Sequence, residues 1–411
     1  MSHSTPQRPR PVQARSIETR QRITAGALAV LAEGGVPGLT HRAVARTAGV
    51  SLAATTYHFA TKADILAEAS KELLDGYLAA FARMEARLLR GEETGIRTLA
   101  DLERRLVQNA LGRERARSLA WCELILHACR SEAGRALAQD WYRRLDDIWQ
   151  AIAGHLGAAD PAAEARIAID RVAGLTFLLH AFAPTPAQLA DLLAGRLSLG
   201  QLVPPAGRSG AEDPDRPMPA ARLRVLDAAI GLLIDEGAAG VTYRAVADRA
   251  GMVRSGPSYH FPSIDILLDA AQTELTQRAK LRYRAGLGAI APGDIDAGRL
   301  VDLTTAIFFR EALEYPRENV GLYSVWLRAA QSPALRASVG AALAEMDSAW
   351  QRRIASIGGD CCAPQAALIL QALFVGKLIR AVAAGAGMAE LARARDGFAR
   401  AVQEARDGAA T

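Results

Sequence analysis

The stretch THRAVARTAGVS at residues 40–51 recurs as TYRAVADRAGMV at residues 242–253, and this repetition decides how the chain is organised. Gly49 of the first stretch matches Gly251 of the second, an offset of 202 in a chain of 411 residues. The match runs without a gap from residues 20–69 to residues 222–271. Similarity at one fixed offset indicates an internal duplication, so each half of the chain should hold one copy of the same module.

The repeated segment is predicted to form three helices and a tight turn. Apolar residues at helical spacing predict a first helix that ends at Gly34-Gly35. Thr40 stands where an N-cap is needed before a short helix over residues 41–48, and Thr242 repeats it. A glycine turn at residues 49–51 leads into a helix over residues 52–59, and Thr61 then caps a long amphipathic helix. This order is typical of a helix-turn-helix.

Weaker similarity continues beyond these segments, where Ser131 matches Ser332 at an offset of 201 and Gly174 matches Gly376 at 202. Few aromatic residues and many Ala, Leu, Arg and Glu favour an all-α protein with more than one core. Residues 200–219, rich in Pro, Gly and Asp, interrupt the helical pattern and predict a linker. The predicted parts are a basic arm (1–15), helix-turn-helix domains (16–62 and 220–264), further helical domains (63–199 and 265–411) and the linker (200–219).

The stretch at residues 40–51, followed by Tyr57-His58-Phe59 and Thr61-Lys62, resembles the DNA-binding domain of the tetracycline-repressor (TetR) family. Beyond residues 20–69 and 222–271 the two halves match that family mainly in length, helical character and order. The resemblance implies two TetR-like modules, each with a three-helix helix-turn-helix domain and a helical-bundle regulatory domain. It implies a sequence-specific transcriptional regulator, most simply a repressor, whose partners are double-stranded operator DNA and a small-molecule effector.

The resemblance places DNA contacts on the second and third helices of each copy. Tyr57, Lys62 and Thr40 should hold phosphates, while side chains of the third helix should face bases in the major groove. Val44, Ala48 and Phe59 are interpreted as core, and His58 either packs between helices or touches the DNA backbone. The candidates are Thr40, His41, Arg42, Leu52, Ala53, Thr55, Thr56, Tyr57, His58, Lys62, Thr242, Tyr243, Arg244, Arg254, Ser255, Ser258, Tyr259 and His260.

The second copy differs where bases would be contacted. LAATT at residues 52–56 becomes RSGPS at residues 254–258, and Lys62 becomes Ile264. Because Pro257 would damage a helix interior, the second recognition helix is predicted to start later, with Ser255 as its cap. The operator should therefore have two dissimilar halves. Alternatively, the second copy has lost DNA binding and persists for dimer-like packing.

The resemblance also implies a ligand pocket and a two-helix dimer face in each regulatory half. The apolar runs 167–182 and 367–383 are the predicted interface, made within one chain as a pseudo-dimer. Their charged residues, Asp170, Arg171, Lys377 and Arg380, suggest rim positions or polar pairing. Pocket candidates are Trp121, His127, Trp149, Tyr323, Trp326 and Trp350, with further aromatic residues nearby, and core packing is the competing interpretation. Association of two chains is also compatible with the sequence.

Composition limits the other classes of function. The net charge is +5, and the basic residues from Arg8 to Arg22 form either a polyanion-binding arm or a solvated tail. No secretory signal or run of about 20 apolar residues is apparent, so a cytoplasmic protein without membrane contact is expected. Four cysteines are expected to be reduced, although Cys122 and Cys129 share a helix face that admits thiol sensing. No phosphate loop, metal cluster or catalytic set appears, so no enzyme, metal or cofactor is predicted; the alternative to a regulator is a helical scaffold without DNA binding.

Overall fold

The computed structural model describes residues 11–203, 218–287, 296–357, 363–385 and 387–407, and all regular structure in these residues is helical. The all-α prediction is confirmed for this part of the chain. The first half contains α1 (Pro11–Gly38), α2 (His41–Ala48), α3 (Leu52–His58), α4 (Lys62–Leu89), α5 (Leu99–Leu111), α6 (Arg115–Ala128), α7 (Glu132–His155), α8 (Pro161–His180), α9 (Pro186–Leu193) and α10 (Leu199–Leu202).

The second half repeats the order of the first eight helices, with one short 3₁₀ turn inserted. It contains α11 (Ala220–Glu236), η1 (Ala238–Gly240), α12 (Tyr243–Ala250), α13 (Gly256–His260), α14 (Ile264–Leu287), α15 (Ala297–Leu313), α16 (Pro316–Ala329), α17 (Pro333–Ser356), α18 (Ala363–Ala384), α19 (Met388–Ala392) and α20 (Ala394–Asp407). Most of the predicted linker, residues 204–217, lies outside the described residues, as do residues 1–10 of the predicted arm. Residues 11–15, assigned to that arm, belong to α1.

Local chemistry explains the helix-turn-helix of each half. The Thr40 hydroxyl accepts a hydrogen bond from the Ala43 amide at 3.1 Å, which caps α2, and Thr242 caps α12 through Ala245 at 3.2 Å. At the other end of the helix, Gly49 and Gly251 both have φ of 63°, a left-handed conformation that glycine adopts at little cost. The predicted caps and glycine turns are therefore confirmed.

The first helix departs slightly from its predicted end. Gly35 is non-helical, with φ of 58°, but the chain resumes helical turns as far as Gly38, so α1 is kinked there and continues. In the second half Gly237, with φ of 84°, ends α11, and η1 follows. The same glycine thus breaks the helix in both halves.

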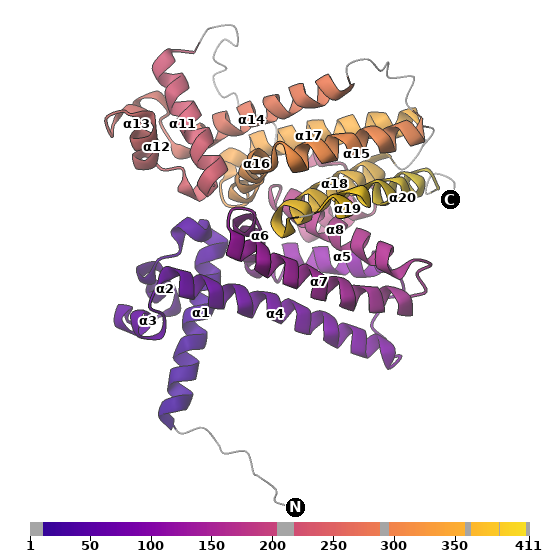
Figure 1. Cartoon of the computed structure of the whole chain (residues 1–411), viewed down its shortest axis with the longest axis horizontal. Helices are drawn as coiled ribbons and strands as arrows, with labels where there is room; N and C mark the ends of the chain where they lie inside the picture. Colours follow the sequence, from indigo (N-terminus) through magenta and orange to yellow (C-terminus); the bar gives the residue numbers. More distant parts are fainter. Residues whose placement is uncertain (1–10, 204–217, 288–295, 358–362, 386, 408–411) are drawn as a thin grey trace, which may run out of the picture.

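The two halves meet where α8 packs against α18, near the centre of the molecule (Figure 1). A Cβ added at Gly174 would lie 1.8 Å from the carbonyl oxygen of Ala372, and one at Gly376 would lie 1.8 Å from that of Asp170. At the offset of 202, Gly174 corresponds to Gly376 and Asp170 to Ala372. These are the same contact with the two halves exchanged, the property expected of a two-fold related interface.

A second pair of contacts obeys the same exchange. Arg130, just after α6, donates to the carbonyl oxygen of Ile234 in α11 at 3.3 Å. Gln331, just after α16, donates to the carbonyl oxygen of Ala32 in α1. Arg130 corresponds to Gln331 at an offset of 201 and Ala32 to Ile234 at 202. The end of α6 and the end of α16 therefore each contact the first helix of the other half.

The crossing is also the site of a buried polar cluster. Asp170 pairs with Arg380 at 2.6 Å and with Lys377 at 3.2 Å, and all three side chains are buried. Arg380 reaches Asp146 at 2.8 Å and lies over the ring of Tyr142, 4.5 Å from its centroid. Burial opposes the charge of Arg380, but Asp170 and Asp146 outweigh it and raise the pKa of the guanidinium. Of the two predicted alternatives for these charges, polar pairing is confirmed and rim positions are wrong.

One helix does reach the length of a membrane span, contrary to the sequence prediction. Residues 364–384 of α18 have a mean hydropathy of 1.8, the only such window in the described residues. Within this window 78% of the residues are buried against the rest of the protein. Its apolar character is explained by packing between the two halves.

We expect Gly174→Ala and Gly376→Ala each to lower the free energy of unfolding by about 2–3 kcal/mol, because the new methyl group would force the two backbones apart. Thermal or denaturant unfolding of the full chain measures this effect. Gly154→Ala is the matched control, since this glycine is exposed near the end of α7 and a Cβ there meets only ordinary contacts with Pro161. The control should change stability by no more than about 1 kcal/mol. Equal stability of all three variants would contradict the close crossing.

Candidate functional site

The outward surface of the first helix-turn-helix is formed by α2, α3 and the start of α4. Tyr57 is 83% exposed and carries its ring away from the protein, with His58 packed edge-on at 5.2 Å. A tyrosine side chain is rarely exposed to this degree unless its ring contacts a partner. The other predicted contact residues that are exposed here are Thr40, Arg42, Leu52, Ala53, Thr56 and Lys62.

Thr55 corrects the sequence prediction. We expected it to face bases, but its side chain is fully buried, and its hydroxyl donates to the Leu52 carbonyl oxygen at 2.8 Å. His41, half-buried, places Nδ1 3.3 Å from the same hydroxyl, so part of its polar capacity is also used inside the domain. In the second half Pro257 takes the place of Thr55 and is likewise buried. This position holds α3 and α13 against the domain.

The second recognition helix starts later, as predicted. α13 begins at Gly256 and Pro257 lies in its first turn, where no amide hydrogen is needed. Ser255 occupies the N-cap position, but its side chain makes no capping hydrogen bond. Tyr259 is 85% exposed with His260 against its ring at 5.2 Å, which repeats the arrangement of Tyr57 and His58.

The remaining predicted residues of the second half divide into two groups. Thr242, Arg244, Arg254 and Ser258 are exposed on the outward surface. Tyr243 is half-buried, and its hydroxyl donates to the carbonyl oxygen of Phe261 at 2.8 Å. Burial raises the pKa of that hydroxyl. Tyr243 is thus held by a hydrogen bond to the backbone, whereas His41, its counterpart, contacts the Thr55 hydroxyl.

The two outward surfaces differ in charge. Arg42 and Arg46 lie one turn apart on α2, both exposed, whereas the matching residues of α12 are Arg244 and Asp248, which approach each other at 3.9 Å. The sequence prediction missed Arg46 and Asp248, although their spacing of four from Arg42 and Arg244 placed them on the same helix face. The first domain is therefore better suited to phosphate contacts.

Two arginines assigned to the basic arm instead hold the domain together. Arg20 pairs with Glu68 at 2.9 Å and lies 4.8 Å from the ring centroid of Phe59, and Arg222 repeats the ring contact with Phe261 at 4.8 Å. Arg22 donates to the carbonyl oxygens of Ala48 and Gly49, which closes the turn of the motif. Arg20 and Arg22 therefore stabilise the helix-turn-helix domain and are not part of a free basic arm.

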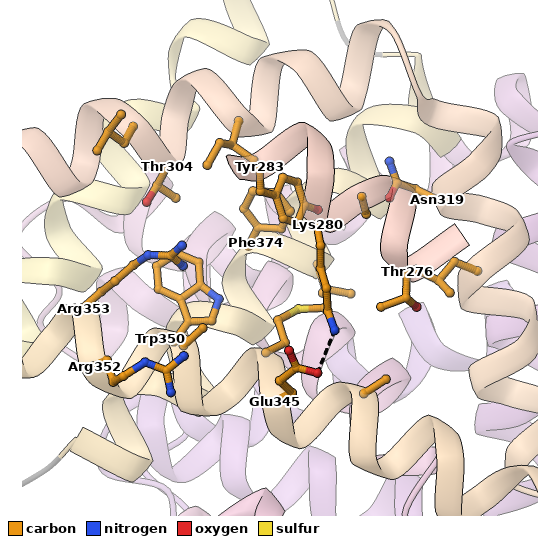
Figure 2. A pocket seen from close by; sticks show the side chains of 18 of the residues that line it. Thr276, Lys280, Tyr283, Thr304, Asn319, Glu345, Trp350, Arg352, Arg353 and Phe374 are labelled. Atoms are coloured by element: carbon orange, nitrogen blue, oxygen red, sulfur yellow. Dashed lines mark hydrogen bonds and ion pairs between the residues drawn. The ribbon is translucent and has the colours of Figure 1, made fainter. Parts of the chain in front are cut away.

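Each regulatory half contains a cavity. The first, of about 360 Å³, includes Trp121, Trp141 and Trp149 in its walls. The second, of about 270 Å³, includes Tyr323, Trp326 and Trp350 (Figure 2). His127 lies outside both linings, because it is six positions beyond Trp121 on α6 and so on another face of the helix. Five of the six predicted pocket residues therefore line cavities.

The cysteine hypothesis finds no support in the surroundings of the thiols. Cys122 is buried, and burial raises its pKa well above the ordinary value. Burial also raises the pKa of Cys129 to about 12. Reactive thiols have the opposite shift, since the thiolate is the reacting form. Cys361 and Cys362 lie outside the described residues, and no group of metal ligands occurs among the residues that are described.

These features define a protein with two helix-turn-helix domains, and comparison with known proteins gives the family. The family model for bacterial regulatory proteins of the tetR family matches residues 23–69 and again residues 225–271. The model for the tetracyclin repressor-like C-terminal domain matches residues 94–199. The chain belongs to the tetracycline-repressor family of DNA-binding transcriptional regulators, as a tandem duplication within one polypeptide.

Similar solved structures correspond to a single module. SCO1917, a TetR-family member from Streptomyces coelicolor A3, is 25% identical over 44% of this chain and 98% of its own, with a TM-score of 0.36. The multidrug binding protein EbrR in complex with imidazole is 25% identical over 45% and 96%, with a TM-score of 0.36. The transcriptional regulator SCO7518 from Streptomyces coelicolor A3(2) is 27% identical over 45% of this chain and 99% of its own, with a TM-score of 0.34. No curated protein gives a significant match.

We expect Arg46→Gln to weaken DNA binding by about three- to tenfold and to reduce the salt dependence by about one phosphate contact. Asp248→Asn should strengthen binding, because it removes an anion that repels phosphates. Affinity for a duplex selected with the native chain, measured at several salt concentrations, tests both. Arg299→Gln removes the same charge from an exposed position on α15 and is the control. An Arg46→Gln variant that behaves like this control would rule out the phosphate contact.

Proposed function

We propose that the chain is a ligand-responsive transcriptional repressor in which one polypeptide supplies both DNA-binding domains of a dimer. The observation that carries the proposal is the pair of outward-facing recognition helices, α3 and α13, on the same side of the molecule (Figure 1). Each exposes one tyrosine on its outward surface, Tyr57 or Tyr259. A two-fold arrangement of such helices suits two half-sites of one operator.

The charges at the crossing favour pairing of unlike halves. Asp170 corresponds to Ala372, while Lys377 and Arg380 correspond to Leu175 and Leu178 at the offset of 202. If two first halves paired, each Asp170 would be buried opposite leucine rather than a cation. If two second halves paired, two lysines and two arginines would lose that carboxylate. Because a buried charge without its partner costs several kcal/mol, the intrachain pairing is preferred over both alternatives.

The operator should have two dissimilar halves. The first surface offers Leu52, Ala53 and Thr56 toward bases, whereas the second offers Arg254 and Ser258 around a helix that starts two residues later at the offset of 202. Arginine can pair bidentately with guanine, and leucine and alanine favour the thymine methyl group. A sequence selection that returned a perfect palindrome would oppose this part of the proposal.

Ligand response follows from linkage between the cavities and DNA. α4 and α14 lead from each DNA-binding domain directly into the wall of a cavity, so a ligand that shifts either helix alters the spacing of the recognition helices. A ligand that favours another spacing weakens DNA binding, and DNA weakens ligand binding by the same factor. Relief of repression by a small molecule in the cytoplasm is the expected outcome.

Replacement of the two exposed tyrosines tests whether both domains bind DNA. We expect Tyr57→Ala and Tyr259→Ala each to reduce affinity for the selected operator by about tenfold, since each removes one phosphate contact and its ring. Gel shifts or fluorescence anisotropy measure the loss, and thermal unfolding shows that the exposed substitutions leave the fold intact. A silent Tyr259→Ala beside a damaging Tyr57→Ala would favour the rival view that the second domain serves packing alone.

Substitutions at the crossing test the single-chain dimer. Asp170→Ala should lower the free energy of unfolding by about 3–5 kcal/mol, because Lys377 and Arg380 lose a buried partner. The triple variant Asp170→Ala, Lys377→Leu, Arg380→Leu makes the crossing symmetric and should regain most of that loss. The native chain should sediment as one 43.7 kDa species and bind the operator as one chain per duplex. A stoichiometry of two chains per duplex would contradict the proposal.

A further inference from the structure

The cavity of the second half combines aromatic walls with cations. Its walls include Tyr323, Trp326, Trp350 and Phe374, from α16, α17 and α18 (Figure 2). The rings of Tyr323 and Trp326 lie 4.6 Å apart at a tilt of 49°. Aromatic faces of this kind accept planar apolar groups. The lining therefore favours a flat ring system.

The cations at this cavity are not all neutralised. Lys280 of α14 pairs with Glu345 of α17 at 2.7 Å across the opening. Arg352 and Arg353 are neighbours in α17. In the described part of the chain, no carboxylate pairs with either of them. Arg353 is half-buried, with its guanidinium 5.7 Å from the ring centroid of Trp350. Burial and the neighbouring Arg352 both lower the pKa of Arg353, so an added anion would relieve both effects.

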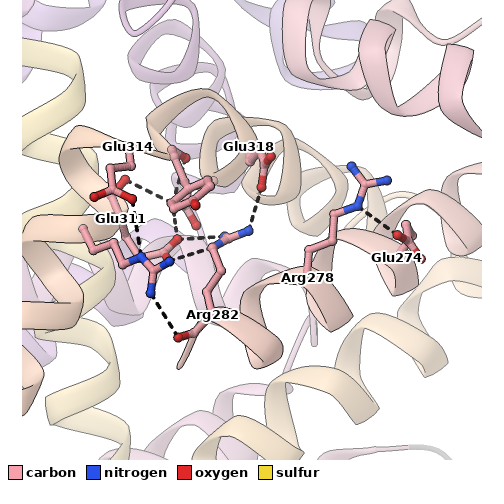
Figure 3. Close-up of polar contacts among 9 residues, drawn as sticks. Glu274, Arg278, Arg282, Glu311, Glu314 and Glu318 are labelled. Carbon is pink, nitrogen blue, oxygen red and sulfur yellow. Dashed lines mark hydrogen bonds and ion pairs between the residues drawn. The ribbon is translucent and has the colours of Figure 1, made fainter. Parts of the chain in front are cut away.

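Arg282, in the same half, is an arginine whose charge is fully paired with carboxylates. Arg282 of α14 makes two hydrogen bonds to Glu311, at 3.0 and 2.9 Å, and one to Glu318 at 2.8 Å (Figure 3). Glu311 is fully buried, and Asn319 donates to it at 2.8 Å. This cluster is complete without a ligand and fastens α14 to α15 and α16. Arg353 has no comparable partner.

The two arginines that follow Trp350 have no cationic counterparts after Trp149 in the first half. At the offset of 201, Arg352 corresponds to Ala151 and Arg353 to Ile152, although Trp350 retains its counterpart in Trp149. The duplicated module thus kept an aromatic wall and differs in the charge beside it. This difference in charge beside a shared tryptophan favours different ligands for the two cavities.

We propose that the cavity of the second half binds a planar aromatic carboxylate, with the carboxylate on Arg353 and the ring system against the aromatic walls. This inference rests on the proposed ligand response and names its ligand class. A volume of about 270 Å³ accommodates a one- or two-ring acid. The ligand would lie between α14 and α17, and α14 continues from the second DNA-binding domain, so binding reaches that domain directly.

Isothermal titration calorimetry of the full chain with 2-naphthoate and with the neutral 2-naphthamide tests the proposal. We expect the carboxylate to bind at least about tenfold more tightly than the amide, since only the carboxylate forms a charge-assisted pair with Arg353. Arg353→Met should remove this preference, Arg353→Lys should retain part of it, and Arg299→Met should leave it unchanged. Equal affinities for acid and amide, or a preference that survives Arg353→Met, would overturn the proposal.

Two further measurements keep the outcomes separate. Thermal unfolding of each variant shows whether it is folded, and the comparison of acid with amide on the native chain needs no variant. Operator affinity is measured in the absence of either compound. Failure to bind any operator would contradict the proposed function and leave the ligand class intact, whereas failure to distinguish acid from amide would do the reverse.

Discussion

The structure depends on the close approach of α8 and α18 at two glycines. Because Gly174 and Gly376 lack side chains, the two backbones touch, and the helices can cross only at one position. This position brings Asp170 within reach of Arg380 at a depth where water does not screen the pair. The separation of the two helix-turn-helix domains therefore depends on a contact between regulatory helices that leaves no room for an added methyl group.

The sequence predicted those elements whose causes are local. Thr40 and Thr61 cap helices through amides three residues away, and Gly49 takes a left-handed conformation that few other residues adopt. Such interactions depend only on neighbours in the chain, so motif and spacing were sufficient. The prediction for Thr55 was wrong because α3 has only seven residues, fewer than two full turns. An apolar pattern this short does not reveal which side of the helix is buried.

Contacts between distant segments could not be predicted in the same way. Arg20 and Arg22 seemed part of a basic arm, yet Phe59, Glu68 and the turn at Gly49 take up their charges from positions more than 25 residues away. A run of arginines in the sequence does not show whether each side chain will contact solvent, a phosphate or a carbonyl oxygen. The aromatic cavity residues could be predicted because large rings at helical spacing are usually buried inside a helical bundle. The prediction for His127 was wrong because the sequence does not show which face of α6 lines the cavity.

Duplication within one chain changes what each half is required to do. In a dimer of identical subunits every interface residue must suit both sides, so an Asp170 without a cation partner would occur twice. Here one half supplies the carboxylate and the other supplies Arg380, and each side is free to specialise. The exchanged contacts of Arg130 and Gln331 remain equivalent in position while their chemistry differs. Each regulatory half thus stays in contact with the opposite helix-turn-helix domain, and under the proposed function this contact couples two different cavities to a single spacing of the recognition helices.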